Sequence, residues 1–190
     1  MLAATEEPAV LARMHPISVD TYHRLGEMGH LSERTELIRG VITDQMPRSP
    51  LHSTIVRLLD KHLLLHLPSG WHPRAEQPLT LPDSEPEPDI AAVAGTEADY
   101  FAQHPRTAAL VIEVCGTSED LDRVKLGLYV EAGVPEAWLV LAGERIVERH
   151  TEPRDGAYRC VERAIFPATL ASTIFPNVIL PSKDLFGTAH

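Results

Sequence analysis

The most informative part of the chain is residues 110–140, which read LVIEVCGTSEDLDRVKLGLYVEAGVPEAWLV. Residues 109–115 are apolar on both faces except for one carboxylate, a pattern typical of a central strand that is covered on both sides. Residues 119–132 show apolar side chains at helical spacing before Gly133, a natural C-cap, and residues 137–141 are again apolar. A strand, a helix and a second strand in this order predict an α/β fold.

The flanking sequence adds elements on both sides of this block. Ser49-Pro50 is a strong helix start, and apolar side chains recur at helical spacing from there to Leu67. Arg39-Gly40 joins two short apolar runs as a hairpin turn, because glycine tolerates a positive φ. The other expected elements are a short helix after Ser18, strands at 71–81, 89–93 and 146–150, a helical turn at 98–103, and a strand-rich tail at 158–186.

Length and composition set the class of protein. The chain has 190 residues, 44% hydrophobic and 23% charged, which is ordinary globular usage; we expect one domain at 16–190 behind a leader at 1–15. No apolar stretch approaches the roughly 18 residues that span a bilayer, and residues 1–14 lack the pattern of a secretory signal. Cys115 and Cys160 form no CxxC pair, so reduced thiols and a cytoplasmic location are expected.

The net charge limits how nucleic acid could be bound. Seventeen basic and 27 acidic residues give a formal charge of −10. Such a surface repels phosphate and argues against nonspecific coating of nucleic acid, although a nuclease can hold its phosphate through metal ions. The motifs of dinucleotide-binding proteins, P-loop proteins, zinc proteases and serine hydrolases are missing from the sequence, so these classes lose most of their support.

Two carboxylates occupy strand positions where apolar side chains are expected. Glu113 lies between Ile112 and Val114, where an unpaired buried carboxylate would be strongly unfavourable. Asp89 begins another apolar strand, so the two side chains could meet at neighbouring strand positions and share a hard divalent cation such as Mg²⁺ or Mn²⁺. The alternatives are a structural ion pair for Glu113 and a turn role for Asp89.

Lys125 is the third candidate, because it falls on the inward side of the helix expected at 119–132. It lies at helical spacing from Leu121 and Leu128, on a stripe that is also expected to include Val124. Its ammonium could reach the two carboxylates and a metal-bound water. Alternatively, it could snorkel outward as a surface lysine with a buried stem.

Other polar residues admit more than one interpretation. Glu36 precedes a hairpin and is compatible with a solvated role. His62 and His66 have the i, i+4 spacing of a helical metal pair, and His52 lies earlier on the same helix, so a histidine-based metal site is one hypothesis. No nearby acid completes a zinc set, and structural roles are expected for His62 and His66 near the helix C-terminus. Cys115 is expected to be a buried, apolar-like thiol.

Several segments occur together in a recognisable order and spacing, and the block at 110–140 is the specific part. They are Glu36-Leu-Ile-Arg-Gly, Ser49-Pro50 with His52, Glu87-Pro88-Asp89-Ile90, Leu110-Val-Ile-Glu113-Val, Lys125, Tyr129-Val-Glu-Ala-Gly-Val-Pro-Glu-Ala-Trp-Leu-Val140, Phe175-Pro176 and Leu185-Phe186. In this arrangement the chain resembles the Uma2 family of restriction-endonuclease-like proteins, in the PD-(D/E)XK nuclease superfamily. The resemblance covers roughly residues 17–186.

The resemblance implies a restriction-endonuclease-like fold: a mixed β-sheet core flanked by helices, with a β-rich C-terminal extension. In the superfamily, the Asp of the Pro-Asp motif and the acid of the (D/E)XK motif bind the metal, which implies Asp89 and Glu113, and an early acid implies Glu36. Cys115 occupies the lysine position of the motif. Uma2-like proteins commonly supply this lysine from the following helix, which implies Lys125.

Two functional hypotheses follow. The first is an endonuclease that uses Mg²⁺ or Mn²⁺ to hydrolyse DNA phosphodiester bonds with a metal-activated water, which Lys125 would orient or deprotonate. DNA is then the expected partner, and a homodimer fits double-strand cutting, which needs two sites. The second is a catalytically silent binding or regulatory module that pairs Glu113 with Lys125. Mn²⁺ affinity discriminates between them, because an ion-paired Glu113 would bind the metal poorly.

Overall fold

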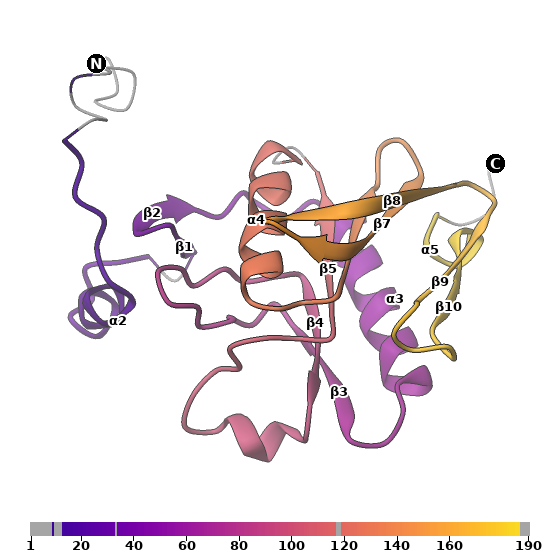
Figure 1. The fold of residues 1–190 in the computed structure, drawn as a ribbon, viewed down its shortest axis with the longest axis horizontal. Helices are drawn as coiled ribbons and strands as arrows, with labels where there is room; N and C mark the ends of the chain where they lie inside the picture. The colour runs from indigo at the N-terminus through magenta and orange to yellow at the C-terminus, as the bar shows by residue number, and fades with distance from the viewer. Residues whose placement is uncertain (1–8, 10–12, 33, 117–118, 187–190) are drawn as a thin grey trace.

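The centre of the molecule is a six-stranded sheet in the order β3-β4-β5-β6-β7-β8 (Figure 1). The computed structural model describes residues 9, 13–32, 34–116 and 119–186. β5 and β6 are parallel and all other neighbours in this sheet are antiparallel, so the mixed sheet expected from the sequence is confirmed. Its strands are β3 (Trp71–Ala75), β4 (Ile90–Ala94), β5 (Leu110–Cys115), β6 (Glu136–Leu141), β7 (Ile146–Arg154) and β8 (Ala157–Ile165).

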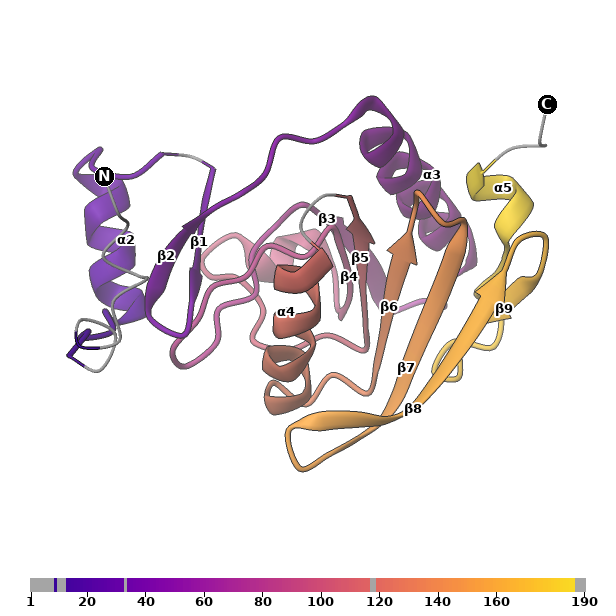
Figure 2. The same ribbon diagram turned by 90° about the horizontal axis from the view of Figure 1, so that it is seen from above.

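Helices cover both faces of this sheet (Figure 2). α3 (Pro50–His66) buries four apolar side chains in a core cluster that includes Leu110 of β5. α4 (Glu119–Glu131) packs on the opposite face, in a cluster that includes Val111 of β5. Because successive side chains of a strand point to opposite faces, β5 is buried on both sides, as its continuous apolar pattern predicts.

Local signals in the sequence set the start of α3 and the first hairpin. The Ser49 hydroxyl accepts a hydrogen bond from the His52 backbone N–H at 3.1 Å, which caps α3 as expected. The hairpin joins β1 (Thr35–Ile38) to β2 (Val41–Asp44) through Arg39 and Gly40, both with positive φ. A side chain at Gly40 would also collide with Pro16, so glycine is required there for two reasons.

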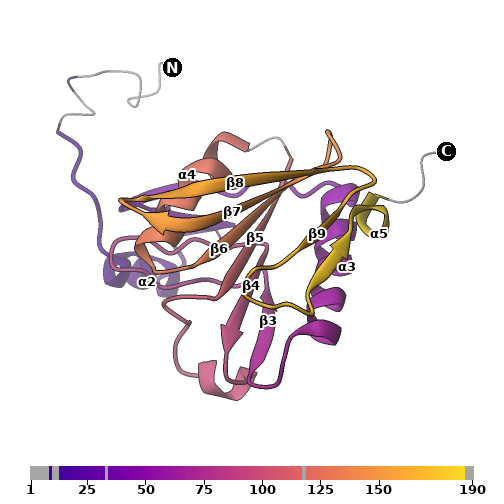
Figure 3. The ribbon, with the colours of Figure 1, turned by 45° about the vertical axis from the view of Figure 1, so that its right-hand side comes forward.

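Two smaller units flank the sheet. The hairpin and α2 (Val19–Glu27) lie at one side, where the Tyr22 hydroxyl donates to the Thr35 carbonyl at 2.7 Å. The β-rich tail lies at the other side, next to α3 (Figure 3). Its elements are β9 (Thr169–Ala171), β10 (Ile179–Pro181) and α5 (Ser182–Phe186), and a short 3₁₀ helix, η2 (Glu97–Tyr100), precedes β5.

The strand expected at 71–81 is wrong in its length. β3 ends at Ala75 because Glu76 adopts a left-handed conformation with a φ of 54°. Beyond it the backbone bonds to two separate loops: the Leu79 N–H donates to Pro86 and the Thr80 N–H donates to Pro105. These bonds join positions distant in the chain, which local periodicity does not reveal.

The expected inward stripe of α4 needs one correction. Val124 is 55% exposed, whereas Asp122 and Lys125 are buried together with Leu128 and Tyr129. The inward face of α4 therefore begins with polar side chains, and both line a cavity. Most of the leader expected at 1–15 lies outside the described residues.

No helix in the described part of the chain has the length and apolarity needed to cross a membrane.

Candidate active site

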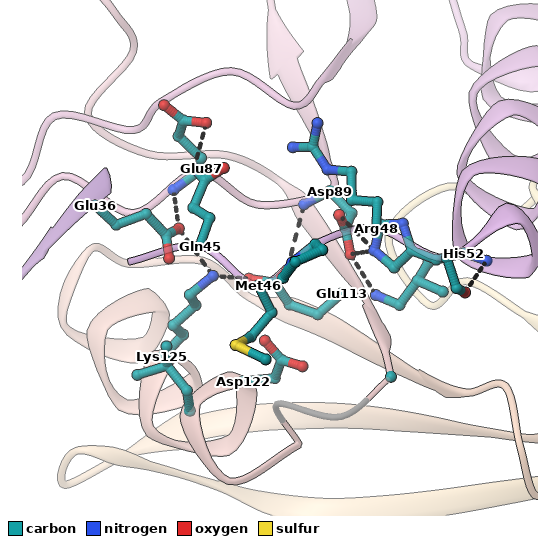
Figure 4. Close-up of a pocket in the computed structure, with 15 residues that line it drawn as sticks. Glu36, Gln45, Met46, Arg48, His52, Glu87, Asp89, Glu113, Asp122 and Lys125 are labelled. Atoms are coloured by element: carbon teal, nitrogen blue, oxygen red, sulfur yellow. Dashed lines mark hydrogen bonds and ion pairs between the residues drawn. The ribbon is translucent and has the colours of Figure 1, made fainter. Parts of the chain in front are cut away.

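A small cavity of about 160 Å³ lies where β4 and β5 meet the N-terminal ends of α3 and α4 (Figure 4). Carboxylates dominate its wall, since five acidic side chains contribute to it: Glu36, Glu87, Asp89, Glu113 and Asp122. The basic side chains of the wall are Arg48, His52 and Lys125. All four residues that the sequence singled out as candidates, Glu36, Asp89, Glu113 and Lys125, are therefore brought together at one place.

Asp89 directly precedes β4 and lies beside Glu113 of β5, one step beyond the antiparallel pair Ile90 and Ile112. The Asp89 backbone N–H donates to Glu113 Oε2 at 3.3 Å. In return, the Val114 backbone N–H donates to Asp89 Oδ2 at 2.7 Å. Each carboxylate is thus fixed by the backbone of the other strand.

Lys125 reaches into the cavity from α4. Its Nζ lies 2.9 Å from Glu36 Oε1 and 3.6 Å from Glu113 Oε1, and the residue is only 5% exposed. Glu36 is buried as well, and the Glu87 backbone N–H donates to its Oε1 at 2.6 Å. The alternatives of a surface lysine and a solvated Glu36 are therefore wrong.

Tyr129 supports Glu113 from the same face of α4. Its hydroxyl donates to Glu113 Oε1 at 2.5 Å in a fully buried contact. Burial, followed by the charge of Glu113, raises the pKa of the Tyr129 hydroxyl well above its usual range, so it remains a proton donor. α4 thus presents an ammonium and a phenol to one carboxylate.

His52 supports Asp89 from the first turn of α3. Its Nε2 lies 3.1 Å from the carboxylate, and because an ionised carboxylate only accepts, Nε2 carries the proton. This hydrogen bond raises the pKa of His52 despite its partial burial. The other ring nitrogen, Nδ1, is buried without a hydrogen-bond partner among the described residues.

The wall of the cavity has more acidic than basic side chains. Burial and this excess of acids shift the pKa values of the groups in it. Burial, together with the charges of Asp89, Asp122 and Glu36, raises the pKa of Glu113 to about 8, although Lys125 opposes the shift. Burial also raises the pKa of Asp122. Burial alone would lower the pKa of Lys125, but the charges of Glu113 and Glu36 outweigh it and keep the ammonium protonated.

The side chains of the cavity are of the chemical type that binds a hard divalent cation. All the candidate ligands are carboxylate oxygens, and a cation would relieve the excess negative charge that raises the pKa of Glu113. In geometry, the described residues contain no group of three or more His, Cys, Asp or Glu side chains already arranged around one point. Lys125 lies between Glu36 and Glu113 instead.

The hypothesis of a three-histidine metal site is wrong, because His52 lies in the first turn of α3, whereas His62 and His66 lie at the opposite end of this helix. His62 and His66 stack with ring centroids 4.2 Å apart, and His66 Nδ1 donates to the His62 carbonyl at 2.7 Å. His52 is bonded to Asp89.

Cys115 occupies the last position of β5 and is buried. Burial, aided by the charge of Asp122, raises the pKa of its thiol far above the usual range, so it is not a thiolate nucleophile. The expectation of an inert, buried thiol is confirmed. Thr117 and Ser118, in the loop that follows, lie outside the described residues.

Sequence reasoning missed the roles of three residues in or beside this cavity. Tyr129 was noted only within the resemblance to the Uma2 family, His52 only there and in the histidine metal hypothesis, and Asp122 had no assigned role. Asp89 lies 37 residues from His52 in the chain, so no local pattern could join them. For Asp122 a signal was present, since it precedes Lys125 by three residues and therefore shares its helix face.

The fold and the cavity together are those of a nuclease-like α/β protein. The model of the Uma2 family, described as "Putative restriction endonuclease", matches residues 19–182. The chain therefore belongs to the Uma2 family.

One solved structure is similar over most of both chains, and it is described as a "putative nuclease belonging to DUF820" from Anabaena variabilis. The likeness has a TM-score of 0.75 at 20% identity and covers 90% of this chain and 98% of the other. At this identity it establishes the shared fold. A comparison with curated proteins gave no match.

Proposed function

We propose that this protein is a divalent-metal-dependent endonuclease that hydrolyses phosphodiester bonds in DNA. The observation that carries the proposal is the cavity in which Asp89, Glu113 and Glu36 are buried beside the protonated Lys125. Membership of a family described as restriction endonucleases supports the same activity. The restriction-endonuclease-like fold is generally associated with divalent metals.

Asp89, Glu113 and Glu36 are the residues that would hold Mg²⁺ or Mn²⁺. A bound divalent cation supplies Lewis-acid stabilisation of the charge that develops on the phosphate. The protein's part is to fix the carboxylates: β4 and β5 hold Asp89 and Glu113 against each other, and the Glu87 backbone N–H holds Glu36. His52 and Tyr129 complete this support.

Lys125 supplies positive charge close to the phosphate. Because the raised pKa keeps Nζ protonated, we assign it the stabilisation of negative charge and the orientation of the attacking water. The other role considered for it, deprotonation of that water, requires a neutral amine and is disfavoured by the same carboxylates that hold the ammonium in place.

A second candidate function rests on a specific observation. Lys125 already pairs with Glu36 and Glu113, as it would in a catalytically silent binding module. In that case a divalent cation would have to displace the ammonium, and metal affinity would be poor. A homodimer, a cytoplasmic location and a single domain at 16–190 stay predictions under either function.

The test is cleavage of supercoiled plasmid and of single-stranded DNA in Mg²⁺ or Mn²⁺. Wild type is compared with Asp89→Ala and Glu113→Ala, and with Glu162→Ala, an exposed acid on β8, as the matched control. Cleavage that is lost in the first two variants and kept in the control supports the nuclease. Absence of cleavage by wild type, or equal cleavage by all variants, refutes it, and a Mn²⁺ titration then tests the silent module.

A further inference from the structure

Arg48 connects the active-site cavity to two neighbouring hollows on the surface. One hollow is lined by Arg34 and Arg48, and the other by Arg48 and Arg57. The active-site cavity also includes Arg48 in its wall, and Figure 4 shows this side chain beside Asp89. Arg34 and Arg57 therefore each share one hollow with Arg48, which also lines the cavity, and we call these three residues the arginine track.

The three arginines of the track differ in whether a carboxylate lies close to them. Arg34 and Arg57 are exposed, and neither has a carboxylate within 4 Å among the described residues. Among the described residues, the Arg34 guanidinium donates to the Met46 carbonyl, at 3.1 Å. Guanidinium groups without a close carboxylate, each in a hollow shared with Arg48, are available to an anion that reaches both hollows.

Acidic side chains also line the two hollows, and among those described only Glu76 is paired with an arginine. Glu76 pairs with Arg48, with Oε1 and Nε 3.1 Å apart. Glu87 accepts a hydrogen bond from the Gln45 amide at 2.6 Å. Asp60 is half-buried on α3. Three arginines and three acidic side chains line the two hollows, so in a chain with a net charge of −10 this surface is less acidic than the chain as a whole.

Glu76 positions the central arginine. Its φ of 54° is unusual for a residue with a side chain, and its backbone N–H donates to the Asp89 carbonyl at 3.0 Å. The turn that ends β3 is thereby tied to the residue before β4. Its carboxylate then holds Arg48 in the wall of the cavity, with the Arg48 side chain still about one-third exposed.

The lining of these hollows also indicates which form of nucleic acid fits. No Phe, Tyr or Trp is among the described residues that line the cavity or either hollow. Proteins that bind single strands without sequence preference combine positive charge with aromatic stacking of bases. Arginines without aromatic partners suit contact with phosphates alone, as on the outside of a duplex.

We propose that Arg34, Arg48 and Arg57 contact successive phosphates of one strand of duplex DNA and carry that strand across the active-site cavity. The inference rests on the proposed function for its choice of substrate. It adds the path of the strand, the form of the nucleic acid and the residues that bind it.

The test is the affinity of the full chain for a labelled duplex of about 20 base pairs and for one of its strands, measured by fluorescence anisotropy at several salt concentrations. The Asp89→Asn background with Mg²⁺ prevents cleavage during the measurement. Arg34→Gln, Arg48→Gln and Arg57→Gln are compared with Arg106→Gln. Arg106 is the matched control, because it is exposed, has no ion pair among the described residues and lies before β5, at the far end from Glu113.

Each track variant is expected to bind the duplex about 3- to 10-fold more weakly, and to lower the slope of log affinity against log salt by about 0.9. Arg106→Gln is expected to stay within about twofold of the background. An equal loss in Arg106→Gln would show diffuse attraction and overturn the track, as would tighter binding of the single strand.

The same data separate this inference from the proposed function. Duplex binding through the track by a wild type that never cleaves DNA would support the track and refute the hydrolysis. Metal-dependent cleavage together with unchanged binding in all three track variants would support the hydrolysis and overturn the track.

Discussion

Two neighbouring strands each bury a glutamate, and the two carboxylates have different kinds of partners. Glu136 at the start of β6 is fully buried, and neutral groups satisfy it: Trp138 Nε1–H donates to Oε1 at 2.6 Å and the Thr173 N–H donates to Oε2 at 2.8 Å. Glu113 on β5 is equally buried, but its surroundings include Asp89, Lys125 and a cavity.

The difference shows that burial of a carboxylate does not identify a functional site by itself. Glu136 lies in register with Leu110, so it points to the face of the tail, where Thr173 fastens that tail to the sheet. Glu113 points to the face of α4, toward other charged groups. A buried acid with saturated neutral partners is structural, whereas one that shares a cavity with like charges is available for a cation.

The largest effect that separates the two glutamates is expected in DNA cleavage. Glu113→Gln should lower the initial rate of plasmid nicking by about 100-fold or more, because a neutral amide replaces an anionic ligand. Glu136→Gln should stay within about threefold of wild type, because it lies on the other face of the sheet. Comparable losses in both variants would contradict the division of roles.

For stability, the larger effect is expected at Glu136 and the smaller at Glu113. Glu136→Ala should lower the free energy of unfolding by about 2 kcal/mol, because the Trp138 donor is left buried without a partner and the tail loses its bond through Thr173. Glu113→Gln, measured in a chelator near neutral pH, should change it by less than about 1 kcal/mol, since the raised pKa keeps Glu113 largely protonated and the amide resembles the protonated acid. Urea denaturation followed by circular dichroism measures both free energies of unfolding. A greater loss of stability in Glu113→Gln than in Glu136→Ala would contradict the assigned roles.

Lys125 provides a test of whether an ammonium occupies the place of a cation beside Glu113. If its ammonium competes with a divalent cation for Glu36 and Glu113, Lys125→Met should bind Mn²⁺ about tenfold more tightly than wild type. Calorimetric titration gives the affinity, and Lys183→Met on α5 is the control. Unchanged or weaker binding would show that the ammonium does not occupy the place of the cation.

The smallest effect concerns pH. The pKa of Glu113 is about 8 in the folded chain against an ordinary value of 4.5, so between these values the folded state keeps a proton that the unfolded state releases. Stability of the metal-free protein should therefore fall as pH rises from about 5 to 8, by a fraction of the ~1.4 kcal/mol per pH unit that one group can give.

The control for this prediction is the other glutamate. Glu113→Gln should flatten the fall in stability, and Glu136→Gln should keep it. His52, whose pKa is also raised, contributes stability that is present at low pH and lost as pH rises through its folded pKa, so a residual slope of the same sign should persist. An identical pH dependence in wild type and Glu113→Gln would contradict the assigned titration.

Much of the fold could be predicted because its signals are local. Ser49 caps α3, Arg39 and Gly40 turn the hairpin, and the apolar run of β5 marks a central strand. The length of β3 could not be predicted, because the positive φ of Glu76 is fixed by bonds to distant loops.

The candidate site divides in the same way. Glu113 and Asp89 were detectable as charges in apolar strands, and Lys125 as a charge on an inward helix face. Their support was not detectable, because the bond from His52 to Asp89 depends on how α3 packs against the sheet. Glu136 escaped notice because the strand expected at 137–141 begins one residue earlier.

The reciprocal bonds between Asp89 and the strand of Glu113 also bear on the order in which the protein matures. Asp89 can accept the Val114 N–H only after β4 has paired with β5 in the correct register. A nascent or partly folded chain lacks that pairing and carries its acids on separate segments. Any hydrolytic activity therefore arises only once the sheet has formed. The cell that makes this protein is then exposed to that activity only from the folded chain.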